Sequence, residues 1–154
     1  MFVTFCTKEM NICMLVYLAG AISWYVHNNK YDECLRWRKS ITEKLNALGI
    51  ECFDACVNVE NNVTYNHISN VKQNLYYLGK ADLVVVNTDH LIESSGTIFE
   101  LAYCYLNHKP VIGLGIDERI PTYRHISVCI DQCLQDEDEV IKYIKSLYSF
   151  SLKK

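Results

Sequence analysis

Short apolar runs alternate along the chain with longer segments whose apolar residues recur at helical spacing. The clearest run, DLVVVN at 82–87, is apolar on both faces, as strands inside parallel sheets are. Segment 31–48 has the helical pattern, and Gly49 follows where a glycine commonly ends a helix. The patterns predict strands at 14–19, 50–53, 82–87, 111–114 and 126–130, and helices at 31–48, 68–78, 95–106 and 136–148. The polar stretch 55–67 is predicted to be a loop.

This alternation predicts a three-layer α/β fold of the flavodoxin or Rossmann-like type, with an about five-stranded parallel sheet and helices on both faces. With 154 residues and neither repeats nor linkers, the chain is expected to form one domain over 1–154, with 1–13 as an N-terminal extension. Ligands of such sheets bind beyond the carboxyl ends of the strands, where strand order reverses. Segment 17–20, loop 87–94 and the start of helix 95–106 should surround that crevice.

Charge and composition exclude several classes of partner. The formal net charge is -3, the pI is about 5.9, and Lys and Arg are scattered, which argues against nucleic-acid binding. Lys8 and Glu9 interrupt the apolar N-terminus, and no run approaches the roughly 18 apolar residues of a membrane span. A cytoplasmic protein without a membrane partner is expected.

The eight cysteines indicate reduced thiols in a cytosolic setting rather than a disulfide framework. The pairs Cys52/Cys56 and Cys129/Cys133 have a spacing compatible with zinc, but structural zinc usually draws on tighter, repeated knuckles. The glycines form neither a dinucleotide-binding fingerprint nor a Walker A motif. No metal and no cofactor are therefore expected.

Glu100 is the one charged residue of helix 95–106, and its neighbours are apolar or aromatic. A buried carboxylate without compensation is costly, so a partner or an opening onto the crevice must favour it. Ser94 or Ser95 can cap the helix, and Gly96 lets a ligand approach the backbone. A carboxylate facing the crevice suits attack on C1 of a sugar. From the residues alone, a glutamate paired with Lys or Arg, or turned to solvent, remains the alternative.

Several segments together carry a family resemblance: VYLAGAIS at 16–23, WR at 37–38, FD at 53–54, KADLVVVNTD at 80–89 and SSGTIFELAYCYLNHKPVIG at 94–113. On these motifs the chain resembles the nucleoside 2-deoxyribosyltransferase family and its relatives that hydrolyse nucleotide N-glycosidic bonds. The resemblance implies that a glutamate attacks C1′, the base leaves, and a second base or water takes the sugar. It makes Glu100 the nucleophile and Tyr17 the residue that positions it, and it places Gly20 in the nucleoside-binding loop.

The sequence departs from the family at two positions that commonly hold aspartates. Asn74 and Ser94 stand there, and neither can deliver the proton that a leaving base normally needs. Asp89 and His90, in the loop after strand 82–87, are the candidate replacements. A solvated turn that caps the strand is the alternative interpretation of both.

The remaining predicted substrate-binding residues are Asn87, at the end of its strand, and the helix start Ser94, Ser95, Gly96 and Thr97, which suits a 5′-phosphate. Arg36 and Arg38 are interpreted as solvated helix charges. The first hypothesis is an enzyme of N-glycosidic chemistry acting on a small-molecule nucleoside or nucleotide, as the homodimer or higher oligomer that the resemblance implies. A nucleotide-signal-binding module without turnover is the second, and a purely structural domain is the third.

Overall fold

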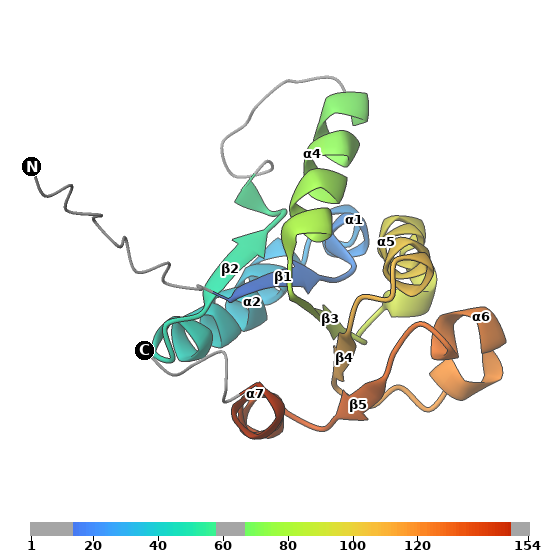
Figure 1. The fold of residues 1–154 in the computed structure, drawn as a ribbon. Helices are drawn as coiled ribbons and strands as arrows, with labels where there is room; N and C mark the ends of the chain where they lie inside the picture. Colours follow the sequence, from blue (N-terminus) through green and yellow to red (C-terminus); the bar gives the residue numbers. More distant parts are fainter. Residues whose placement is uncertain (1–13, 58–66, 149–154) are drawn as a thin grey trace, which may run out of the picture.

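The computed structural model describes residues 14–57 and 67–148, so the expected extension 1–13 and most of loop 55–67 lie outside the described residues. Within them a five-stranded, all-parallel sheet has the strand order β2-β1-β3-β4-β5 (Figure 1). The strands are β1 (Leu15–Ala19), β2 (Glu51–Asp54), β3 (Leu83–Asn87), β4 (Val111–Leu114) and β5 (Gln132–Leu134). The helices are α1 (Ile22–His27), α2 (Tyr31–Asn46), α4 (His67–Lys80), α5 (Ser95–Leu106), α6 (Arg124–Ser127) and α7 (Glu137–Leu147), with 3-10 turns at Leu91–Glu93 and Ile120–Thr122.

Alternation along β1 divides the core into two layers. Successive side chains of a strand point to opposite faces, so Val16 and Leu18 pack with α2 and α7, while Tyr17 packs with α4 and α5. All three side chains are fully buried. The predicted three-layer, flavodoxin-like α/β fold is thereby confirmed, and the direction of Tyr17 toward α5 follows from its place in β1.

Strand order reverses next to β1. The chain leaves β1 through α1 and α2 to reach β2 on one side, and it returns through α4 to β3 on the other (Figure 1). A ligand crevice is expected at the carboxyl end of β1 for this reason. The ends of β1 and β3 lead directly into Gly20 and into the loop that precedes α5.

Local sequence explains the boundaries of two helices. Ser94 Oγ accepts a hydrogen bond from the backbone N–H of Thr97 at 3.4 Å and starts α5, as predicted. Asp136 caps α7 in the same way, with Oδ1 2.9 Å from the backbone nitrogen of Glu139. Three acidic residues in the first turn of α7 stabilise the helix through their interaction with the positive end of its dipole.

The sequence-based prediction of a strand at 126–130 is wrong. Residues there form α6 and the turn after it, and the last strand is β5. Ile126 and Cys129 are buried in the core layer that contains α5, three residues apart on one side of a helical turn. A short apolar run fits a buried strand and a buried helical turn equally well. Two smaller differences are α1, which was not predicted, and α4, which continues through Gly79 to Lys80.

Among the residues that the structure describes, no helix combines the length and apolar character needed to cross a membrane.

Candidate functional site

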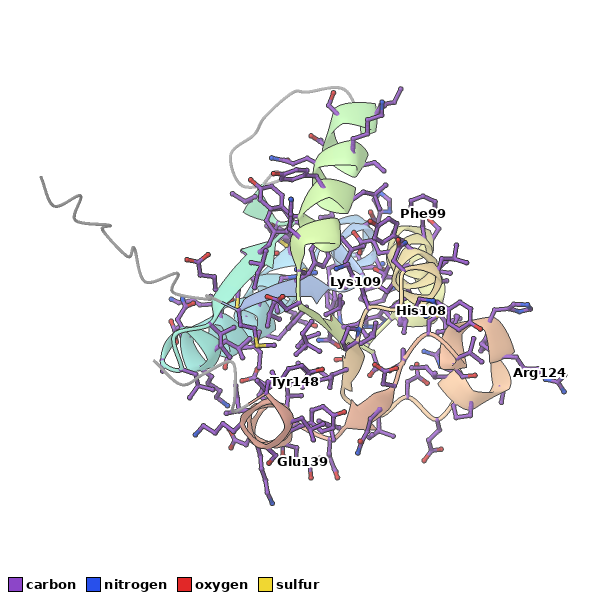
Figure 2. All side chains as sticks on the ribbon, viewed as in Figure 1. Phe99, His108, Lys109, Arg124, Glu139 and Tyr148 are labelled. Carbon is purple, nitrogen blue, oxygen red and sulfur yellow. The ribbon has the colours of Figure 1, made fainter. Side chains whose placement is uncertain are left out.

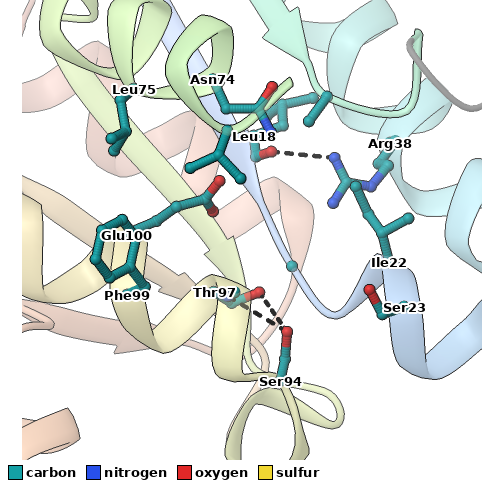
Figure 3. Close-up of a pocket in the computed structure, with 14 residues that line it drawn as sticks. Leu18, Ile22, Ser23, Arg38, Asn74, Leu75, Ser94, Thr97, Phe99 and Glu100 are labelled. Carbon is teal, nitrogen blue, oxygen red and sulfur yellow. Dashed lines mark hydrogen bonds between the residues drawn. The ribbon is translucent and has the colours of Figure 1, made fainter. Parts of the chain in front are cut away.

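A cavity of about 240 Å³ lies at the carboxyl end of β1, where the strand order reverses. We call it the Glu100 cavity. Its walls come from the segment after β1, from α2, from one face of α4 and from the first turns of α5. The lining residues are Leu18, Gly20, Ile22, Ser23, Arg38, Ala55, Val71, Asn74, Leu75, Ser94, Gly96, Thr97, Phe99 and Glu100 (Figure 3). Its volume lies just below the range of about 300–1000 Å³ that is typical of pockets for drug-sized ligands, which indicates a small ligand.

Glu100 is half-buried and extends from α5 into this cavity (Figure 3). The hydroxyl of Tyr17 donates a hydrogen bond of 2.6 Å to Oε1 of Glu100. Burial raises the pKa of Glu100 above its ordinary value, while the bond from Tyr17 and the charge of Arg38 lower it. Burial, followed by the negative charge of Glu100, raises the pKa of Tyr17. Tyr17 thus remains a protonated donor that fixes one carboxylate oxygen and leaves Oε2 for a ligand.

Arg38 is buried, with 1% of its surface exposed, and it forms part of the cavity wall. Its Nη1 donates to the backbone oxygen of Leu18 at 3.0 Å and to Oδ1 of Asp54 at 2.6 Å. The interpretation of Arg38 as a solvated helix charge is therefore wrong, whereas Arg36 is exposed as expected. Nε and Nη2 of Arg38 lack a hydrogen-bond partner among the described residues. The guanidinium joins β1 to the end of β2 and keeps unused N–H groups at this wall.

Gly20 is the close neighbour of Arg38 on the β1 side. A Cβ added at Gly20 would lie 3.0 Å from Cζ2 of Trp37 and 3.2 Å from Nη2 of Arg38. A side chain at this position would push against the buried arginine, which explains why a glycine follows β1. Gly20 lines the cavity, and its place in a ligand-binding loop stays a prediction.

The start of α5 forms another wall of the cavity. Ser94, Gly96 and Thr97 line it, and Ser95 lies beside them, exposed to solvent. Ser94 and Thr97 are mutually engaged, with their hydroxyl oxygens 2.8 Å apart, so both serve the helix cap. A Cβ built on Gly96 meets nothing within 4 Å, which shows open space beside its backbone.

Asn74, on α4, also lines the cavity, together with Val71 and Leu75 of the same helix. Figure 3 shows its amide near Leu18, on the side of the cavity toward which Glu100 extends. Asn74 and Glu100 thus line the same cavity, and the role of Asn74 in substrate binding stays a prediction.

The other three predicted residues lie elsewhere. Asn87 and Asp89 line a neighbouring cavity of about 440 Å³ with Trp37. There the side chain of Asn87 accepts a hydrogen bond of 2.8 Å from the backbone N–H of Asp89, which is a turn that caps β3. His90 adopts a left-handed backbone conformation with φ 57° and stacks on Trp24, with ring centroids 3.3 Å apart. None of the three is among the described residues that line the Glu100 cavity, so their roles in binding or catalysis stay predictions.

Sequence reasoning missed Arg38 as a site residue, although a signal was present. Cys34, Arg38, Ile41 and Leu45 are the four buried residues of α2, and their spacing of four, three and four places Arg38 on the core stripe. A charged residue on that stripe indicates a buried partner. The same region holds a thiol pair that was also missed, with Sγ of Cys34 and of Cys56 3.9 Å apart.

The comparisons with known proteins agree with this arrangement. The family model described as nucleoside 2-deoxyribosyltransferase-like matches residues 13–117, which is more than half of the chain and contains the strands, helices and loops that build the Glu100 cavity. The chain belongs to this family. No curated protein matches the sequence significantly.

A solved structure supports the fold of this nucleoside 2-deoxyribosyltransferase-like chain. The crystal structure of a conserved protein from Enterococcus faecalis V583 is similar, with a TM-score of 0.64 and 15% sequence identity. The match covers 87% of the present chain and 98% of that protein. At this identity the likeness concerns the fold alone. The family match and the residues of the Glu100 cavity carry the argument about function.

Proposed function

We propose that the protein cleaves an N-glycosidic bond of a nucleoside or nucleotide, with Glu100 as the nucleophile at C1′ of the sugar. The observation that carries this proposal is the Tyr17–Glu100 pair, in which a buried tyrosine holds one carboxylate oxygen at the edge of the Glu100 cavity. A carboxylate that is fixed and partly desolvated is a competent nucleophile for a sugar. The sugar then passes to a second base or to water.

The substrate is proposed to lie between α5 and the wall formed by Gly20 and Arg38. Asn74 supplies a polar group beside Glu100, and the open backbone at Gly96 admits the ligand near the start of α5. A 5′-phosphate there would meet the positive end of the helix dipole together with the exposed Ser95. Tyr17 acts through Glu100, so it is a positioning residue.

The test uses the full chain with a set of nucleosides and 5′-monophosphates, in the presence and absence of a second free base. Release of base and formation of exchanged product are followed by chromatography. We expect release by the unchanged protein and a loss of at least about a thousandfold in Glu100→Gln. Glu93→Gln is the matched control, because Glu93 lies just before α5 and pairs with Arg119 outside the Glu100 cavity. Equal rates in the two variants would refute the role of Glu100.

A second function is favoured by one observation. Among the described residues that line the cavity, Glu100 is the only carboxylic acid, so a neutral leaving base has no evident proton donor there. A binding module for a nucleotide or nucleotide-derived signal would need no such donor. Calorimetry beside the assay separates the two functions, because tight binding of an intact ligand without base release over hours is expected only for the module.

We further infer that the chain acts as a homodimer or higher oligomer. Phe99 and Leu106 of α5 are 56% and 75% exposed, and Phe99 also lines the Glu100 cavity. Figure 2 shows Phe99 on the outer side of α5, away from the sheet. A second copy packed on this helix would cover the cavity. Light scattering should give at least twice the monomer mass, and Leu106→Lys should reduce it.

A further inference from the structure

The Glu100 cavity holds few groups that can exchange a proton. In the described part of the chain, its lining contains two ionisable side chains, Glu100 and Arg38. Glu100 accepts a hydrogen bond from Tyr17, and Arg38 donates one to Asp54. The other lining residues carry apolar, hydroxyl, amide or no side-chain groups. Among the residues that the structure describes, Glu100 therefore has no second carboxylic acid beside it in the cavity lining.

Asp89 and His90, the two candidate proton donors in the loop after β3, make other contacts. Asp89 lines the neighbouring cavity with Trp37 and Asn87, and its backbone N–H is bound in the β3 turn. The ring of His90 lies flat on Trp24, with an interplanar angle of 9°, and Tyr25 meets it edge-on. Neither side chain is among the described groups that face Glu100.

This arrangement restricts the leaving group. When the C1′–N bond breaks, its electron pair goes to the base, and a neutral base must gain a proton to leave readily. Protonation by a positioned acid typically contributes about 10²- to 10⁴-fold to the rate. A base that already carries a positive charge leaves as a neutral molecule and needs no acid.

The charges at the cavity favour the same kind of ligand. Arg38 is paired with Asp54 at 2.6 Å, so the two charges nearly cancel. The carboxylate of Glu100 therefore gives the cavity an excess negative charge. An opposite charge is attracted most strongly where the surroundings exclude water. Phe99, which lines the cavity and is 56% exposed, supplies an aromatic ring for a flat cation.

We propose that the substrate is a mononucleoside or mononucleotide whose base is already cationic, such as a pyridinium riboside or an N7-alkylated purine nucleoside. The proposal rests on the proposed function of Glu100. A carboxylate oxygen of Glu100 bonds to C1′, the C1′–N bond breaks, and its electron pair cancels the positive charge of the base. Water then bonds to C1′, the carboxylate leaves with its electron pair, and the proton of the water passes to solvent.

The experiment uses two matched pairs of substrates that differ in the charge of the base. One pair is 7-methylguanosine and guanosine, and the other is nicotinamide riboside and its reduced, uncharged form. Each is supplied as the nucleoside and as the 5′-monophosphate. Base release by the full chain is followed by chromatography, the enzyme-free rate is subtracted, and Glu100→Gln and Glu93→Gln are run in parallel.

We expect kcat/KM for a cationic member to exceed that of its neutral partner by at least about a hundredfold, the lower end of what an acid contributes. This release should be lost in Glu100→Gln and kept in Glu93→Gln. Cleavage of both members within tenfold, still dependent on Glu100, would overturn the inference and leave the proposed function standing. No Glu100-dependent release from any of the substrates would overturn both.

Discussion

The hydroxyl of Tyr17 in β1 lies 2.6 Å from Oε1 of Glu100 in α5, although the two residues are 83 positions apart in the sequence. Tyr17 is fully buried and Glu100 is half-buried. The strand thus fixes the carboxylate from inside the core, and the helix presents it to the cavity. Much of the expected behaviour of the protein follows from this pair.

Removal of the tyrosine hydroxyl should change the pH dependence of activity. Tyr17→Phe keeps the buried ring and deletes the hydrogen bond that lowers the pKa of Glu100. The pKa of Glu100 should therefore rise, and the acid limb of the kcat/KM profile should move to higher pH, with a fall in kcat of about tenfold or more. Tyr25→Phe is the control, because Tyr25 is buried outside the Glu100 cavity. An acid limb that stays in place in Tyr17→Phe would contradict the assigned hydrogen bond.

Glu100 should lower the stability of the fold at neutral pH. Its folded-state pKa is raised by burial, so the folded protein binds the proton more tightly than the unfolded chain does. The stability linked to this group is present below the unfolded pKa of about 4.3 and is lost as pH rises through the folded pKa. Glu100→Gln should thus be more stable than the unchanged protein at pH 8, by about 1 kcal/mol.

The difference in unfolding free energy between Glu100→Gln and the unchanged protein should shrink as the pH falls toward 5. Urea unfolding at several pH values measures it, and Glu51→Gln, at an exposed position of β2, should show no such trend. A difference that grows on acidification would reverse the sign of the argument.

The ion pair between Arg38 and Asp54 should contribute strongly to stability when only one partner is removed. Asp54→Asn leaves the charge of Arg38 buried, with 1% exposure and no carboxylate. The expected loss of unfolding free energy is about 3 kcal/mol. Asp138→Asn breaks the pair of Asp138 with Lys44, in which the side chain of Asp138 is 86% exposed. This variant should lose less than about 1 kcal/mol of unfolding free energy. Equal losses of unfolding free energy in the two variants, measured by urea unfolding, would show that the buried ion pair contributes no more to stability than the exposed one.

Gly96 offers a test of where the ligand lies. Its Cβ position is open and it belongs to the first turn of α5, so Gly96→Ala should raise the free energy of unfolding by about 0.5–1 kcal/mol. The same methyl group would occupy space at the cavity wall, so ligand affinity should fall about tenfold, or 1.4 kcal/mol. Calorimetry measures the affinity. Unchanged binding in a stabilised variant would place the ligand away from the start of α5.

The sequence predicted the sheet because the strands β1, β3 and β4 are continuous apolar runs between helical patterns. It also predicted α5, whose capping serine and isolated glutamate are local features. The error at 126–130 arose because the spacing of two buried residues, Ile126 and Cys129, belongs to a helical turn. A run of five residues does not distinguish the two periods.

Glu100 could be predicted as a site residue because it is a single charged residue among apolar and aromatic neighbours in its helix. Site residues whose position depends on tertiary contacts were harder to predict from the sequence. Asp89 lies two residues after the end of β3, yet its backbone N–H bonds to Asn87 in a turn at the neighbouring cavity. Arg38 lies on the buried stripe of α2, and its burial depends on contacts with β1 and with the end of β2 that its type alone does not indicate.

The most direct measurement of the central claim is the covalent labelling of Glu100. A nucleoside with fluorine at C2′ of the sugar slows breakdown of a glycosyl-enzyme, so that the intermediate accumulates for mass spectrometry. We predict a mass increase equal to one fluorinated sugar, located on the peptide that contains Glu100, with stoichiometric release of base and no adduct in Glu100→Gln. Label on another residue, or undiminished base release by Glu100→Gln, would contradict the account.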